Sequence, residues 1–327
     1  MIQQLQSRGR FTYDDLQRQF AGVGEKKVAR QSIQHDISSI KKAGFHLEVE
    51  KSGKEVAVSW PDSRAITVKQ LRSKRNVEEK RAIAAFVASL ICGFEKEDLL
   101  GNGVEAPLFH QEEIITALTP DEGDKPKPED VVVAKVRSLW RATQRSFVLD
   151  AGTTTDEIAK KMSSLMLPTK KFSHLQLWTN SRSIFQLTGL PDCQIKTVMI
   201  GGEQRHQTET VSGELAQQCI AAWDPRFSVS VIGATVVDLE RETVGAYNDS
   251  ESLMKAALLS RGGLRIVVAD SSKFCRQAID ASASFSRISP EFVDLIVTDG
   301  RMSHGNGVNI PAIVNKVPII QWDMARQ

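Results

Sequence analysis

The sequence predicts an α/β protein with two parts: a small N-terminal domain and a larger C-terminal domain built on a parallel sheet. From about residue 130, short apolar runs typical of buried strands alternate with amphipathic stretches typical of helices. That alternation predicts a parallel sheet covered on both faces. Residues 1–81 carry a net charge of +7, whereas residues 82–327 carry −5. A chain of 327 residues is long enough for two domains.

The first 60 residues have the pattern of three helices followed by a hairpin. Residues 2–10 and 12–20 form two short helical patterns, and residues 28–44 form a third. The third pattern repeats isoleucine at helical spacing, which predicts one buried stripe: Ile33, Ile37 and Ile40. Residues 45–60 alternate apolar and polar positions around Ser52-Gly53, a hairpin signal. Together these elements predict a winged helix-turn-helix domain over residues 1–60.

The face of the 28–44 helix opposite the isoleucines is polar and suits contacts with base edges and phosphates in a major groove. Its side chains are the candidate DNA-binding residues: Arg30, Gln31, Gln34, His35, Ser38 and Lys41. Because the whole head is basic, duplex DNA is the expected partner. A winged helix that binds protein instead of DNA is the alternative.

Residues 61–130 predict a helical connector and a linker. Residues 62–94 look helical in two pieces, and their apolar end, Ala82 to Phe94, is either a dimerisation helix or core. This apolar run is too short to span a bilayer. Residues 119–130 have the Pro, Lys and Asp composition of a linker. We expect a homodimer or homotetramer, with the apolar helix as a plausible contact.

Residues 131–327 predict the parallel-sheet domain. Its strands are expected within residues 146–151, 174–180, 195–202, 227–234, 264–274, 293–300 and 317–322. Its helices are expected over residues 131–143, from about residue 156, and over residues 181–189, 213–223 and 251–260.

Polar residues and glycines follow these strands repeatedly, and ligands bind outside the carboxyl ends of strands in such sheets. The three threonines after Gly152 are expected in the turn between strand and helix, where hydroxyls and backbone N–H groups can converge on an anion. Their alternative role is to cap the helix. The candidate effector-binding residues are Asp150, Gly152, Thr153, Thr154, Thr155, Asn180, Gly201, Gly202, Arg205, Asp270 and Lys273.

Several chemistries have no support in the sequence. The four cysteines lack C-x-x-C spacing and indicate a reduced, cytoplasmic protein. The six histidines are dispersed, so no metal site is expected. No phosphate-binding P-loop, dinucleotide fingerprint or H-E-x-x-H motif is present, and no cofactor or membrane contact is predicted.

The chain resembles the DeoR/GlpR family of bacterial transcriptional regulators. The resemblance rests on "LDAGTTTDEIAKKM", "TNSRSIFQLTG", "MIGGEQR", "GELA", "SVIGA", "SESLMKAALLSRGGLRIVVADSSKF" and "VDLIVTDG", which occur in that order. "VARQSIQHDISSIKKAG" resembles the family's recognition helix. The resemblance implies a sensor fold related to ribose-5-phosphate isomerase, a phosphorylated sugar or related metabolite as effector, and a repressor released by that effector.

The chain departs from the family pattern in its head and its middle. Ala29 stands where the family usually has a capping Ser or Thr, and Gln34-His35 stands where it usually has two arginines. The stretch "GVGEKK" precedes the third helix, and the connection between head and sensor is longer than usual. Two phosphate-binding charges are therefore missing from the predicted recognition helix.

Two functional classes remain open, a DNA-binding regulator and an isomerase-like enzyme. An isomerase needs an acid/base carboxylate beside its phosphate site, and the carboxylates available are Asp150, Asp238 and Asp270. The Asp-Gly-x-Asp cluster expected of ribose-5-phosphate isomerase is absent, and "GATVVDLE" stands in its place. The sequence therefore favours a regulator over an enzyme.

Overall fold

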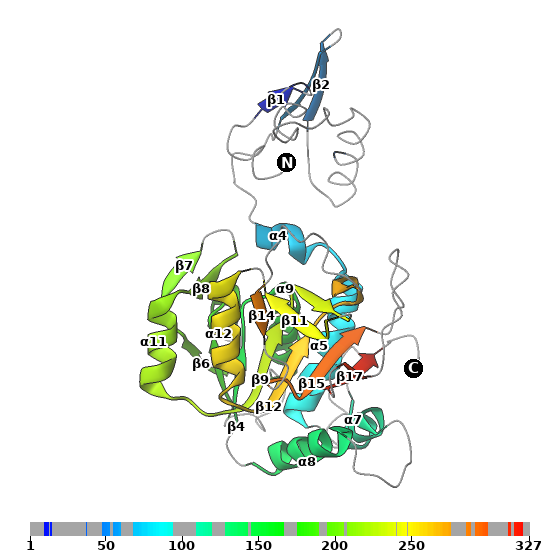
Figure 1. Cartoon of the computed structure of the whole chain (residues 1–327), viewed down its shortest axis with the longest axis vertical. Helices are drawn as coiled ribbons and strands as arrows, with labels where there is room; N and C mark the ends of the chain where they lie inside the picture. Colours follow the sequence, from blue (N-terminus) through cyan, green and yellow to red (C-terminus); the bar gives the residue numbers. More distant parts are fainter. Residues whose placement is uncertain are drawn as a thin grey trace. The chain divides into compact units, whose positions relative to one another are not determined.

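The structure, a computed structural model, forms two compact units, Met1–Arg75 and Asn76–Gln327 (Figure 1). It describes Asp14, Ile37 and residues 10–12, 48–52, 55–59, 68–93, 109–119, 128–142, 145–166, 175–189, 195–205, 208–239, 241–246, 248–275, 286–288, 292–299, 313–314 and 317–322. Each unit is considered by itself.

The first unit contains a small antiparallel sheet in the order β1-β3-β2. Its strands are β1 (Arg10–Thr12), β2 (Glu48–Ser52) and β3 (Glu55–Ser59). Strands β2 and β3 pair from Glu48↔Ser59 to Ser52↔Glu55, which confirms the predicted hairpin. Strand β1 falls where the helical patterns of residues 2–10 and 12–20 meet, so the helical prediction is wrong at Arg10 and Thr12. Three residues are too few for an alternating pattern to be recognised. Helix α4 (Val68–Ser73) follows.

Most of the three predicted helices of the head lies outside the described residues. Ile37 is helical and only 5% exposed, as expected for the apolar stripe of the 28–44 helix. The winged helix-turn-helix arrangement of the head stays a prediction.

The second unit is built on an eight-stranded sheet in the order β16-β17-β15-β12-β9-β4-β5-β6. Its strands are β4 (Arg145–Leu149), β5 (Leu175–Thr179), β6 (Lys196–Met199), β9 (Phe227–Gly233), β12 (Gly262–Val268), β15 (Leu295–Asp299), β16 (Ile313–Val314) and β17 (Val317–Trp322). All pair in parallel except β16, which is antiparallel to β17. The seven predicted strands are therefore confirmed.

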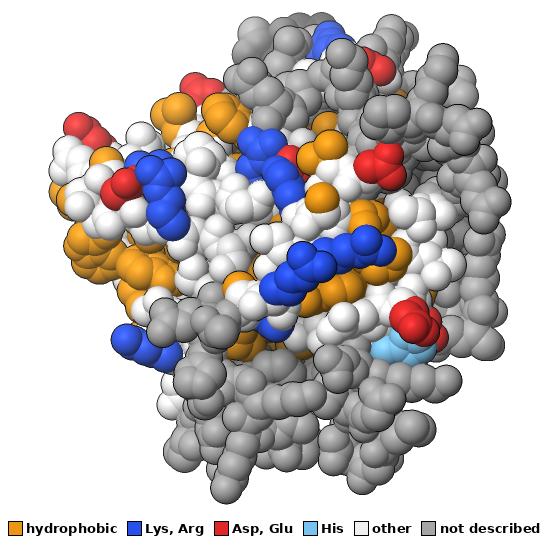
Figure 2. Space-filling model, turned by 90° about the horizontal axis from the view of Figure 1, so that it is seen from below, with side chains coloured by type: hydrophobic (Ala, Val, Ile, Leu, Met, Phe, Trp, Pro, Cys, Tyr) orange, Lys and Arg blue, Asp and Glu red, His pale blue; other side chains and the backbone are white. Residues whose placement is uncertain are grey.

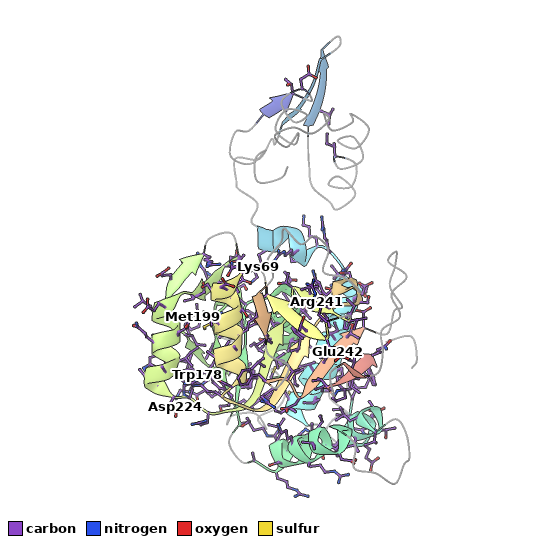
Figure 3. All side chains as sticks on the ribbon, in the orientation of Figure 1. Lys69, Trp178, Met199, Asp224, Arg241 and Glu242 are labelled. Carbon is purple, nitrogen blue, oxygen red and sulfur yellow. The ribbon has the colours of Figure 1, made fainter. Side chains whose placement is uncertain are left out.

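Both faces of this sheet are covered. On one face, Phe147 and Leu149 join a core with α5 (Val77–Cys92), α7 (Gln111–Leu118), α8 (Pro128–Arg141), α9 (Thr153–Met166) and α10 (Arg182–Thr188). Val148 points to the opposite face, which α11 (Glu214–Trp223) and α12 (Asp249–Leu259) cover. On the α11 side, Trp178 (labelled in Figure 3) packs against Trp223, with the two ring centroids 5.6 Å apart. This alternation is the period of a β-strand buried on both faces.

A second sheet, in the order β13-β10-β11-β14, packs beside α12 on that opposite face. Its strands are β10 (Val236–Asp238), β11 (Thr243–Ala246), β13 (Phe274–Cys275) and β14 (Ser286–Ile288). Strands β7 (Glu203–Arg205) and β8 (Thr210–Ser212) form a separate antiparallel pair. None of these short strands was predicted, and neither was α7. No helix among the described residues is long and apolar enough to cross a membrane.

The apolar helix of the predicted connector is core rather than a dimer contact. Every residue of α5 from Ala82 to Cys92 is buried, and α5 packs against α9 and β15 of its own chain. The expectation that this helix joins two copies is therefore wrong. Its apolar residues are spread around the whole helix, which is typical of a buried helix rather than a surface one.

Two predicted helix starts were also too late. Helix α9 begins at Thr153 rather than near residue 156, and α8 begins at Pro128, inside the predicted linker. Proline is well suited to the first helical position, because its missing N–H would be unpaired there in any case. The threonines of the "GTTT" run therefore form the first turn of a helix and not the turn before it.

Candidate functional site

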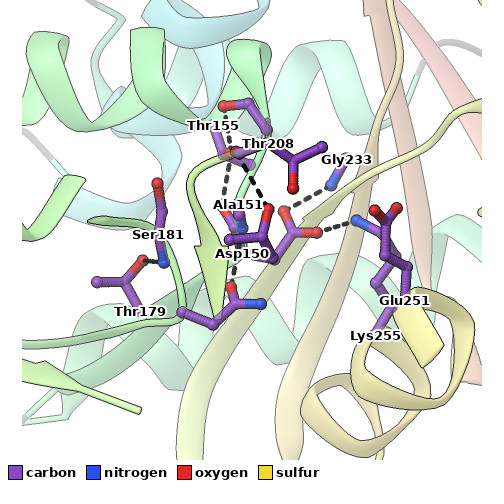
Figure 4. Close-up of polar contacts among 12 residues, drawn as sticks. Asp150, Ala151, Thr155, Thr179, Ser181, Thr208, Gly233, Glu251 and Lys255 are labelled. Atoms are coloured by element: carbon purple, nitrogen blue, oxygen red, sulfur yellow. Dashed lines mark hydrogen bonds and ion pairs between the residues drawn. The ribbon is translucent and has the colours of Figure 1, made fainter. Parts of the chain in front are cut away.

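The strand order reverses between β4 and β9. From β4 the chain continues outward to β5 and β6, then returns to β9 on the other side of β4 and continues to β12, β15 and β17. In open parallel sheets the crevice outside the carboxyl ends of the strands lies at this point of reversal. Here β4 is followed by Asp150 and β9 ends at Gly233, and Figure 4 shows the polar groups around them.

A buried ion pair occupies this point. Lys255 Nζ of α12 donates to Asp150 Oδ2, and the backbone N–H of Gly233 donates to Asp150 Oδ1 at 2.9 Å. Both charged side chains are almost completely buried, Asp150 at 1% and Lys255 at 6% exposed. Burial raises the pKa of Asp150, and Lys255 and the Gly233 N–H oppose that rise. Asp150 therefore ties β4 to β9 and to α12. Lys255 was missed by the sequence analysis.

The N-terminus of α9 offers groups that suit an anion. Thr155 Oγ1 donates within the turn, to the carbonyl oxygens of Asp150 at 2.7 Å and Gly152 at 2.9 Å. Among the residues that the structure describes, Thr153 and Thr154 have no side-chain hydrogen-bond partner. The first N–H groups of a helix also lack partners within it, and they carry its positive dipole end. Thr155 thus supports the turn, whereas the hydroxyls of Thr153 and Thr154 take no part in it.

Asn180 lies beside this turn but is engaged in holding it. Its Oδ1 accepts from the Ala151 N–H at 2.9 Å, and its Nδ2 donates to the Val211 carbonyl at 3.1 Å. The side chain is 3% exposed. Asn180 therefore connects the ends of β4 and β5 with β8.

A second polar group follows β12. Asp270 is 1% exposed, and its Oδ1 accepts from Asn76 Nδ2 at 2.8 Å and from Ser272 Oγ. Lys80 of α5 is 3% exposed, and burial lowers its pKa to about 8. The negative charge of Asp270 opposes that shift, whereas the positive charge of Lys273 adds to it. Asp270 and Lys273 thus act on the same buried ammonium.

Lys80 was also missed by the sequence analysis. Its pKa is also influenced by the charge of Glu157 of α9, against which α5 packs. Lys80 stands among charged residues at the start of α5, before its apolar run, so its sequence position did not mark it as a site residue. The direction in which the Lys80 side chain points depends on how α5 packs on α9, which the sequence does not show.

Two more buried groups at the strand ends have unfilled hydrogen-bonding capacity within the described part of the chain. Asp299 Oδ1 accepts from the Ser271 N–H at 2.6 Å, but Oδ2 is buried without a partner. Burial raises the pKa of Asp299. The Thr208 hydroxyl, on the loop between β7 and β8, is likewise buried without a partner (Figure 4). Such groups cost about 1–3 kcal/mol each unless a ligand or water satisfies them.

The remaining predicted effector residues lie after β6. Gly202 has φ 144°, and a Cβ there would lie 2.7 Å from the Ala216 Cβ. A side chain at Gly201 would contact Cys219 Sγ at 3.4 Å. Both glycines therefore let the chain pass close to α11. Arg205 is half-buried on β7. Ligand roles for Gly201, Gly202 and Arg205 stay predictions.

The candidate DNA-binding residues lie outside the described residues: Arg30, Gln31, Gln34, His35, Ser38 and Lys41. Their roles stay predictions. Among the described residues, no three His, Cys, Asp or Glu side chains are grouped as metal ligands would be.

Comparison with known protein families gives one match that decides the family. The DeoR C-terminal sensor domain matches residues 136–300, half of the chain. The chain belongs to the DeoR family. The matched residues run from α8 to the end of β15. Among the polar residues described above at the strand ends, they include Asp150, Lys255, Asp270 and Asp299 but not Lys80.

Two curated DeoR-type relatives extend the similarity. The chain is 25% identical to a putative aga operon transcriptional repressor of Escherichia coli O157:H7 over 76% of this chain and 89% of that protein. It is 30% identical to the transcriptional repressor AccR of Agrobacterium fabrum over 53% of this chain and 61% of that protein.

Among solved structures, a ribose 5-phosphate isomerase A from Methanocaldococcus jannaschii matches 46% of this chain and 56% of its own. The identity is 12% and the TM-score 0.29.

Proposed function

We propose that this DeoR-family chain is a cytoplasmic, DNA-binding transcriptional repressor whose C-terminal domain binds a phosphorylated sugar or a related metabolite. The observation that carries the proposal is the set of buried charged and hydroxyl groups at the point where the strand order reverses. The relatives' names as transcriptional repressors support the regulatory part.

In this proposal the phosphate lies against Gly152 to Thr155. Lys80 and Lys273 supply positive charge, and the free first-turn N–H groups of α9 donate to the phosphate oxygens. We infer that Asp270 and Asp299 accept from sugar hydroxyls, because carboxylates are poor neighbours for a phosphate. Arg205 would close over the ligand from β7. Asp150 and Asn180 hold the crevice in shape.

Thr154→Val should weaken effector binding about tenfold, because a hydrogen bond to a charged group is worth about 1.5–3 kcal/mol. A thermal-shift screen against pentose and hexose phosphates identifies the ligand, and titration then gives its affinity for each variant. Lys273→Met should weaken binding similarly. Neither variant should unfold the free protein.

Two matched variants control this experiment. Lys160→Met removes an exposed lysine of α9 and should leave ligand affinity unchanged. Thr155→Val should lower the stability of the free protein, because the Thr155 hydroxyl supports the turn. If a ligand stabilises Thr154→Val and Lys273→Met as well as the original chain, the proposed site is wrong.

The isomerase alternative is weakened for Asp150, the carboxylate at the point where the strand order reverses. Both oxygens of Asp150 are engaged, by Lys255 and by Gly233. Asp238 Oδ1 accepts from the Arg241 N–H at 3.0 Å, and Asp270 Oδ1 already accepts twice. A general base needs a carboxylate oxygen that can reach the substrate's proton. Turnover of a bound sugar phosphate by the purified protein would restore the enzyme proposal.

The DNA contact is proposed for the exposed face of the 28–44 helix. Gln34→Ala should relax sequence preference by about 1–3 kcal/mol at one base pair, since glutamine can bind adenine through two hydrogen bonds. Arg30→Ala and Lys41→Ala should instead weaken binding to all sequences. Competition binding with specific and random duplexes separates the two effects. Equal losses on both duplexes for Gln34→Ala would contradict base recognition, and a head that binds protein would show neither effect.

We propose a homodimer or homotetramer in which the contact is not α5, since α5 is buried in its own chain. Pairing two DNA-binding heads raises affinity through effective concentration. Light scattering at micromolar concentration should give a multiple of the 36.2 kDa chain mass, and a monomer mass would contradict the proposal.

A further inference from the structure

A cleft between α7 and α8 is formed by different elements and different residues from the polar groups at the strand ends. It is an open cleft of about 550 Å³ between α7 and α8, within the size range of small-molecule sites. Helix α7 lies outside the residues matched by the sensor family, and α8 is matched only from residue 136. The lining residues are Gln111, Glu112, Ile115, Thr116, Arg137, Trp140 and Arg141.

Trp140 is a fixed wall of this cleft. Its Nε1 donates to the Leu90 carbonyl at 2.8 Å. Its ring lies on Gly93, where a Cβ would stand only 2.3 Å from Trp140 Cδ1. Gln111 Nε2 donates to the Gly93 carbonyl at 3.0 Å and so closes the same wall. An aromatic ring held in this way binds a flat partner with little loss of conformational entropy.

Two arginines on α8 give the cleft positive charge. Arg137 and Arg141 are four residues apart, so they lie on one face of the helix, and both are exposed. Within the described part of the chain neither guanidinium has an ion-pair partner. The helix dipole favours a cation in the last turn and accounts for Arg141, but it does not account for Arg137.

A further positive charge is bonded to the backbone of Trp140. Arg145 is half-buried, and its guanidinium donates to the carbonyls of Ile91, Cys92 and Trp140. Glu112 is the one carboxylate among the lining residues. Figure 2 views the molecule from below Figure 1. In the centre of that face, Lys and Arg side chains lie along an apolar strip.

We propose that the α7–α8 cleft binds a small anion that carries an aromatic or heteroaromatic ring. The ring stacks on Trp140, and Arg137 and Arg141 hold a carboxylate or phosphate through paired hydrogen bonds. Glu112 accepts from an amino or hydroxyl group of the ligand. This site is separate from the proposed sugar-phosphate site and does not depend on it.

The test is isothermal titration of the full-length chain with benzoate, AMP, cyclohexanecarboxylate, ribose 5-phosphate and inorganic phosphate. We expect benzoate or AMP to bind with a Kd below about 1 mM. Cyclohexanecarboxylate and inorganic phosphate should bind at least tenfold more weakly, because neither offers an aromatic ring to stack on Trp140. Benzoate and AMP distinguish a carboxylate ligand from a phosphate ligand.

Variants assign the bound ligand to the cleft. Arg137→Gln and Arg141→Gln should each weaken ring-anion binding at least tenfold. Arg226→Gln removes an equally exposed arginine outside the cleft and should have no effect. The proposal is overturned if neither ring anion binds the chain, or if both cleft variants bind as Arg226→Gln does. It is also overturned if AMP binding falls in Thr154→Val and not in the arginine variants.

Discussion

Lys255→Met should lower the free energy of unfolding by about 3–5 kcal/mol at pH 8. It leaves Asp150, only 1% exposed, as a buried charge without its cation. The same residues should tolerate joint replacement far better. Asp150→Asn combined with Lys255→Met removes both charges, and its cost should be well below the sum of the two single costs. Urea unfolding of the three variants measures this difference.

The stability of Lys255→Met should depend on pH, because Asp150 then takes up a proton in the folded state. Burial already raises the pKa of Asp150 above 3.8, and loss of Lys255 raises it further. The folded variant then holds a proton that the unfolded chain releases, so its stability falls as pH rises through the folded-state pKa. The variant should be closer to the original chain at pH 5.5 than at pH 8. Lys160→Met, which loses an exposed pair, should cost below about 1 kcal/mol at both. If Lys255→Met lowers the free energy of unfolding by less than about 1 kcal/mol at pH 8, Asp150 and Lys255 do not form a buried charge pair.

Effector affinity should fall above pH 8, by up to about tenfold per pH unit, because Lys80 loses its proton there. Burial lowers the Lys80 pKa to about 8, and a bound phosphate would favour the charged form. The phosphate itself does not titrate in this range, since its second pKa is about 6. Titration of the sugar phosphate from pH 7 to pH 10 measures the effect. In Lys80→Met binding should be weak throughout and much less dependent on pH.

The free protein offers an independent check on Lys80. Because its pKa is lowered on folding from 10.5 to about 8, the unfolded chain binds the proton more tightly. Relative to Lys80→Met, the stability of the original chain should therefore rise as pH increases from 8 to 10.5. Parallel pH profiles for the two proteins would show that Lys80 is not buried as a charged group.

The sheet and its polar edge could be predicted because strand and loop patterns are local. Apolar runs ending in Asp150, Asn180 and Asp270 mark strand ends in the sequence itself, and parallel pairing brings such ends to one edge. The two lysines of the site could not be found in this way. Lys255 and Lys80 lie in helices, and only the packing of α12 and α5 turns them towards the strand ends.

The errors have related causes. The apolar α5 has the same sequence pattern whether it is buried in its own chain or in a dimer, and only the fold separates the two. The threonine run has low helix propensity, but Gly152 and the Thr155 hydroxyl stabilise the first turn of α9. Short strands such as β7 and β13 are fixed by tertiary pairing and leave no alternating pattern.

The most direct test of an effector-gated repressor is fluorescence anisotropy of the intact chain on duplex DNA from its own upstream region. The affinity should fall at least about tenfold between 50 and 200 mM salt, since phosphate contacts release counterions. A saturating sugar phosphate taken from the screen should weaken binding by about 5- to 150-fold. DNA affinity that is independent of salt, or unchanged when that sugar phosphate is bound, would contradict the account.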